Sequence, residues 1–71
     1  MMAATKQTPK YNVNAKVRDG NAYAIMGAVT QALRKAGASE EERKQYTDEA
    51  TSGDYDNLLR VSMRWVNIVL D

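Results

Sequence analysis

Reactive side chains are scarce in this sequence, because its 71 residues include neither cysteine nor histidine. A nucleophilic site built on Cys/His or Ser/His/Asp therefore cannot form, and thiolate or imidazole metal ligands are absent. Asp, Glu, Lys or Tyr in a pocket would have to carry any acid–base catalysis, and so short a chain rarely forms a deep pocket. The composition predicts a protein that is not an enzyme and has no cofactor or metal.

One pair of carboxylates, Asp54 and Asp56, has the Asp-x-Asp spacing of some cation sites. The further ligands of a calcium loop are missing around it. Asp54 also stands just before an expected helix, where Asp is a preferred N-cap. We therefore expect helix capping at this position rather than metal binding.

The formal net charge of +1 gives no strong field toward nucleic acid or a membrane. No apolar run approaches the length of a signal-peptide core or a membrane span, so a cytoplasmic location is the default expectation. Residues 1–10 are small and polar, which is typical of a flexible tail. Residues 11–71 are then expected to form one small domain.

A first helix is predicted from about Ala22 to Ala36. Asn21 or Asp19 is a suitable N-cap, and Gly37 is the residue expected just after the helix end. Seven apolar side chains share a stripe of about 120°: Ala22, Ile25, Met26, Val29, Ala32, Leu33 and Ala36.

A second helix is predicted to begin after Ser39 and to end near Thr51. Ser39 and Glu42 have the spacing of a capping box. The apolar face of this helix is thin, since only Tyr46 and Ala50 contribute to it. We therefore expect weak packing for this helix.

A third helix is predicted from Tyr55 to about Asn67, with Asp54 as its cap. Its polar arc is about 100° wide and holds Asp56, Asn57, Arg60, Arg64 and Asn67. The remaining arc is more apolar than a surface helix needs, so either this helix is central to the fold or it meets another chain. Val61 and Trp65 on that arc are expected to be core residues or, in the alternative, an interface with a partner or a second copy.

Both ends of the domain carry strand-like patterns. Tyr11–Val17 alternates apolar and polar residues, which predicts a half-buried strand; an extended arm lying on the helices is the alternative. The apolar, β-branched segment Ile68–Leu70 is expected to pair with it as an edge strand rather than to continue the helix. The predicted fold class is thus mainly α, a compact three-helix domain with two short terminal strands that pair.

Tyr23, Gly27, Thr30 and Arg34 share one flank of the first helix, outside its apolar stripe. Glycine inside a helix costs about 1 kcal/mol relative to alanine, so we expect the space at Gly27 to be used. Another helix or strand could cross closely there, or the flank could contact a ligand or partner.

Two other candidate sites concern anions. Gly20 and Asn21 precede a helix whose free amides could bind a phosphate group. Asn57, Arg60 and Arg64 could face DNA if the second and third helices form a helix-turn-helix. The acidic outer face of the second helix argues against this, because it would face the phosphate backbone.

The segments GNAYAIMG (Gly20–Gly27) and EATSGDYD (Glu49–Asp56) resemble a group of small uncharacterised proteins. These are encoded by bacteriophages, prophages and related mobile elements, and the resemblance covers roughly Val17 to Val66. It implies a phage accessory setting, in which small proteins often block or sequester host components. It implies no activity.

Three functions follow as expectations. The first is a small binding or regulatory protein that acts on a host protein or small ligand and self-associates. The second is a small DNA-binding regulator that uses the third helix. The third is a sponge for a signalling nucleotide held at Gly20 and Asn21.

Overall fold

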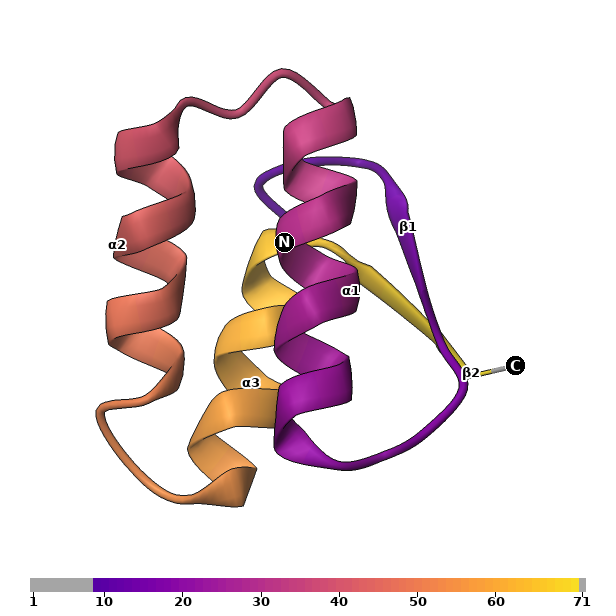
Figure 1. Ribbon diagram of the computed structural model, residues 1–71, viewed down its shortest axis with the longest axis vertical. Coiled ribbons are helices and arrows are strands. Elements are labelled where there is room, and N and C mark those ends of the chain that lie inside the picture. Colours follow the sequence, from indigo (N-terminus) through magenta and orange to yellow (C-terminus); the bar gives the residue numbers. More distant parts are fainter. Residues whose placement is uncertain (1–8, 71) are drawn as a thin grey trace, which may run out of the picture.

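The computed structural model describes residues 9–70 of the chain. Its elements follow in the order β1 (Asn14–Val17), α1 (Ala22–Lys35), α2 (Glu40–Ala50), α3 (Tyr55–Trp65) and β2 (Asn67–Leu70) (Figure 1). The two strands pair in parallel, so the three helices together form the crossover between them. The predicted class, three helices with two short terminal strands that pair, is confirmed.

All three helix starts use the caps that the sequence predicts. The side chain of Asn21 accepts from the Ala24 amide at 2.8 Å, and that of Asp54 accepts from the Asn57 amide at 3.0 Å. Ser39 forms both halves of a capping box with the residue three positions on. These oxygens satisfy amides that have no partner inside a helix.

α3 ends two residues earlier than predicted, at Trp65 rather than Asn67. Val66 is already extended, with φ −146° and ψ 171°, and the Asn67 amide donates to the Val13 carbonyl at 2.9 Å. The β-branched run that begins at Val66 favours extended backbone, and pairing with β1 satisfies its amides. Extended backbone therefore replaces the last two residues of the predicted helix.

The segment Tyr11–Val17 is predicted to be either a strand or an extended arm, and the structure contains both. Only Asn14–Val17 is a strand, whereas the preceding residues form an arm across the end of α3. The amides of Lys10 and Tyr11 donate to the carbonyls of Arg64 and Trp65, both at 2.8 Å, which are carbonyls that a helix end leaves free. Lys10 thus belongs to the folded domain rather than to the predicted tail, and residues 1–8 lie outside the described residues.

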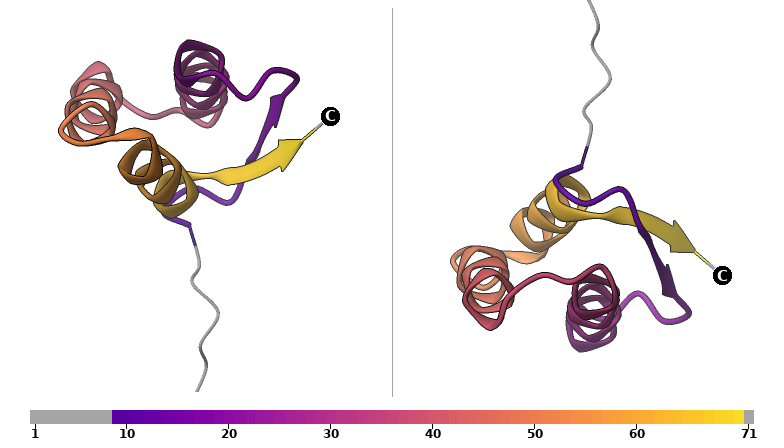
Figure 2. Two further views of the ribbon diagram at one scale, coloured as in Figure 1. Left: turned by 90° about the horizontal axis from the view of Figure 1, so that it is seen from below. Right: turned by 90° about the horizontal axis from the view of Figure 1, so that it is seen from above.

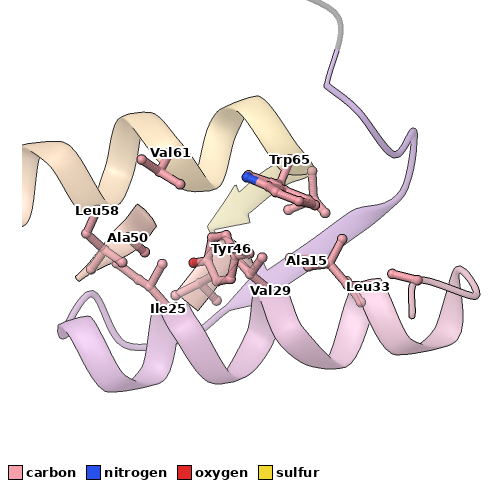
Figure 3. Packing of buried hydrophobic residues seen from close by; sticks show 13 residues of the cluster. Ala15, Ile25, Val29, Leu33, Tyr46, Ala50, Leu58, Val61 and Trp65 are labelled. Carbon is pink, nitrogen blue, oxygen red and sulfur yellow. The ribbon is translucent and has the colours of Figure 1, made fainter. Parts of the chain in front are cut away.

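α3 packs against both other helices and against β2. Figure 2 shows the three helices at the corners of a triangle, with both strands on the side of α1 and α3. Val61 and Trp65 on α3 are only 3% and 4% exposed, and Tyr46 from α2 reaches between α1 and α3 (Figure 3). The wide apolar arc of α3 therefore serves the core of the single chain.

Polar groups within this core are paired. The Tyr46 hydroxyl and the Ser62 Oγ lie 2.6 Å apart, and both side chains are fully buried. Burial raises the pKa of the Tyr46 hydroxyl above its ordinary value. A buried hydroxyl without such a partner would be costly, so this bond fixes α2 against α3.

Aromatic rings close one end of the domain, which we call the aromatic end (Tyr11, Tyr46 and Trp65). Tyr11 stacks on Trp65 with ring centroids 6.5 Å apart, and Tyr46 meets the same ring edge-on at 6.0 Å. The Lys10 ammonium lies 4.7 Å from the Trp65 ring centroid, a cation–π distance. The Trp65 indole nitrogen donates to a Glu49 carboxylate oxygen at 3.1 Å.

Glu42 links α2 to this end. Its carboxylate accepts from the Tyr11 hydroxyl and lies 3.3 Å from the Lys10 ammonium. The hydrogen bond from Tyr11, followed by the contacts with Lys10 and the Ser39 amide, holds the pKa of Glu42 below its ordinary value of 4.5. The same hydrogen bond raises the pKa of Tyr11.

Candidate functional site

Two hollows follow one another along the side of α1 that faces α2, and we call this surface the open face. The apolar hollow has a volume of about 340 Å³ and is lined by Ala22, Tyr23, Met26, Ala50, Thr51, Gly53, Asp54, Tyr55 and Leu58. The basic hollow has a volume of about 470 Å³ and is lined by Gly27, Thr30, Gln31, Arg34 and Arg43. Four of the predicted flank residues, Tyr23, Gly27, Thr30 and Arg34, therefore line the open face.

Large side chains stand exposed around the apolar hollow. Tyr23 is 85% exposed and Tyr55 is 46% exposed, while Met26 and Leu58 supply much of the apolar wall. The Tyr55 hydroxyl donates to the Gly20 carbonyl, which ties the start of α3 to the turn before α1. Exposed tyrosine beside a hollow is typical of a protein-binding surface.

The apolar hollow forms where the segments Gly20–Gly27 and Glu49–Asp56 meet. Ala22, Tyr23 and Met26 belong to Gly20–Gly27, and five of the other lining residues belong to Glu49–Asp56. These segments are far apart in the sequence, and the capped turns at Asn21 and Asp54 bring them together. The residues singled out in the sequence thus share one place on the surface.

The space at Gly27 is open. A Cβ built on this residue would meet no atom within 4 Å. The interpretation that another helix or strand crosses closely at Gly27 is therefore wrong, and the space belongs to the basic hollow instead.

The Gly20–Asn21 turn is occupied by internal contacts. The Asn21 side chain caps α1, and the Asn21 backbone amide donates to the Asp19 carboxylate at 3.2 Å. The Gly20 carbonyl accepts from the Tyr55 hydroxyl. A carboxylate beside the helix start repels an anion. This turn therefore offers a poor site for a nucleotide phosphate.

Of the residues predicted to face DNA, one has internal hydrogen bonds and two are exposed. The Asn57 side chain is half-buried and donates to the carbonyls of Glu49 and Ala50 at 2.9 and 3.4 Å, so it anchors α3 to the end of α2. Arg60 and Arg64 are exposed on the outer side of α3. The candidate DNA surface is thus reduced to two arginines.

Val61 and Trp65 occupy core positions, which is the first of the two interpretations offered for them. With most of the apolar arc of α3 buried, Met63 is its main exposed apolar side chain beyond Tyr55, at 52%. The apolar width of α3 therefore no longer argues for self-association, which stays a prediction.

Sequence reasoning missed Arg43 and Thr51 as members of the open face. Arg43 lies beside the thin apolar side of α2, and its guanidinium donates to the Ala38 carbonyl at 2.8 Å. The weak apolar pattern of α2 does not show how the helix is rotated against α1, so no sequence signal placed Arg43 opposite Arg34. Met26 was expected in the core stripe and is half-buried at the edge of the apolar hollow.

Comparison with known proteins finds no matching family model, no matching curated protein and no matching solved structure. Across residues 9–70, no helix has the length and apolar character needed to cross a membrane. The same residues contain no group of three or more Asp or Glu side chains arranged to hold a metal ion.

Proposed function

We propose that this protein is a small non-enzymatic binding protein that captures a partner protein through the apolar hollow. In this proposal an apolar side chain of the partner enters the hollow and Tyr23 packs over it. The partner is a host protein in the cytoplasm, in keeping with the phage or mobile-element setting that the sequence resemblance implies.

The observation that carries the proposal is the exposure of Tyr23. A tyrosine side chain 85% exposed next to an apolar hollow has little role in folding, because it buries almost no area within the chain. Covering the ring and the hollow would remove apolar surface from water at small entropic cost, since tyrosine has few rotatable bonds. The site is thus suited to bind rather than to stabilise.

Affinity capture from a bacterial lysate tests the proposal when variants are compared side by side. Tyr23→Ala removes the exposed ring, and Thr51→Arg places a bulky charge at the rim of the hollow. Gln45→Ala is the matched control, because Gln45 is exposed on α2 and lines neither hollow. Circular dichroism checks that every variant folds.

The expected result is a bound protein that Tyr23→Ala and Thr51→Arg lose and Gln45→Ala retains. Capture that is the same with all variants, or no protein above the level of the tag alone, would refute the proposed role of the hollow. DNA binding is not favoured as a second function, because Asn57 is held by internal hydrogen bonds.

A further inference from the structure

The basic hollow differs from the apolar hollow in offering hydrogen-bond donors and positive charge. Arg34 from α1 and Arg43 from α2 both line it, together with Gln31. The Thr30 hydroxyl already donates to the Met26 carbonyl at 2.8 Å. The side-chain donors left to a ligand are therefore the two guanidinium groups and the Gln31 side-chain amide.

Neither Arg34 nor Arg43 forms an ion pair with an acid in the part of the chain that the structure describes. The carboxylates in the first turn of α2 do not line the hollow. Two guanidinium groups that share a hollow repel each other, and a bound anion would relieve that repulsion. This excess of positive charge in the basic hollow points to an anionic ligand.

The two arginine side chains differ in how firmly they are held. Arg43 is half-buried, and one of its nitrogen atoms is fixed by the Ala38 carbonyl, so its remaining donors are held in place. Arg34 is exposed and free to close over a ligand. Gly27 also lines the hollow, and the space beside it is open, since a Cβ there would meet no atom within 4 Å.

We propose that the basic hollow binds the phosphoryl group of a small phosphorylated molecule. A phosphoryl group carries about −1.5 to −2 charges at pH 7 and three acceptor oxygens, and guanidinium groups bind it through paired hydrogen bonds. The hollow, at about 470 Å³, has room for more than the phosphoryl group itself. This site is separate from the apolar hollow and does not depend on the proposed partner.

Amide chemical shifts of the isotope-labelled full chain test the proposal during titrations at constant ionic strength. The probes are pyrophosphate, adenosine monophosphate and a short phosphoserine peptide. We expect saturable shifts at Gly27, Thr30 and Gln31, with the nucleoside monophosphate binding more tightly than the peptide. Arg34→Gln and Arg43→Gln should each weaken binding at least about tenfold, because each removes charge-assisted hydrogen bonds.

Lys44→Gln is the control, since it removes the same charge from an exposed α2 residue that does not line the hollow. Arg34→Gln keeps the test valid even if Arg43→Gln disturbs α2, because Arg34 is exposed. Shifts that do not saturate, that spread over lysines and arginines generally, or that weaken equally in Lys44→Gln would overturn the proposal. Tighter binding of the phosphoserine peptide would overturn the assignment to a small molecule.

Discussion

At the aromatic end, side chains from the arm, α2 and α3 bind one another, whereas on the open face several side chains have no partner among the described residues. Trp65 contacts Tyr11 of the arm through its ring, and it contacts α2 through both its ring and its indole nitrogen. The side chains of Tyr23 and Arg34, on the open face, have no hydrogen bond or ion pair with any described residue. The difference indicates that the aromatic end contributes to folding stability, and it supports the proposal that the open face binds a partner.

Replacing the central ring of the aromatic end should have the largest effect. Trp65→Ala removes a buried indole that Tyr11 and Tyr46 both contact, and we expect it to lower the free energy of unfolding by about 3–5 kcal/mol. Urea denaturation followed by circular dichroism measures this. A loss below about 1 kcal/mol would show that stability does not depend on the aromatic end.

Breaking the buried hydroxyl pair should cost less. Tyr46→Phe leaves the Ser62 hydroxyl buried without its partner, with an expected loss of about 1–3 kcal/mol. The double variant Tyr46→Phe/Ser62→Ala should lose less than the sum of the two single variants, because no hydroxyl is then orphaned. Additive losses in the same denaturation experiment would argue against the bond.

On the open face, one substitution should stabilise the protein. Gly27→Ala should raise the free energy of unfolding by about 1 kcal/mol, because alanine favours the helix and its Cβ meets no atom. Thermal denaturation gives the sign directly. A decrease in stability would mean that another part of the chain fills this space.

The Glu42 carboxylate, which accepts from the Tyr11 hydroxyl and pairs with Lys10, should make a pH-dependent contribution to the free energy of unfolding. Because the pKa of Glu42 is lower in the folded state than its ordinary value of 4.5, its charge stabilises the fold above that pH, and the contribution is lost as the pH falls through the lower pKa. Glu42→Gln can still cap α2. At pH 7 this variant should have a lower free energy of unfolding than the unaltered protein, and the difference should shrink as the pH falls. Glu41→Gln, on an exposed residue, should show no such trend.

The smallest effect is expected at the most exposed ring. Tyr23→Ala should change the free energy of unfolding by no more than about 0.5 kcal/mol, since the side chain is 85% exposed. A loss of 2 kcal/mol in urea denaturation would contradict the contrast between the two regions, because it would give Tyr23 a structural role.

Local signals made the helix starts predictable. Asn21, Ser39 and Asp54 each accept a hydrogen bond from an amide three residues further along the chain. A few neighbouring residues are therefore enough to predict each cap. The end of α3 was placed too late, because the choice between helix and strand at Val66 depends on a partner strand more than 50 residues away.

The candidate site was predictable on one helix and not between helices. The flank with Tyr23 and Arg34 follows from helical spacing alone. That Arg43 and Thr51 face it depends on the rotation of α2, which is fixed by the buried contact of Tyr46 with Ser62. Pairwise packing of this kind is not encoded in a local pattern.

Photo-crosslinking in bacterial cells tests most directly whether the open face is the binding surface. A photoreactive p-benzoylphenylalanine is placed at position 23 in one sample and at position 45, on the exposed side of α2, in another. We predict a discrete crosslinked protein from position 23 and none from position 45. Crosslinking from position 45 with none from position 23 would contradict the account.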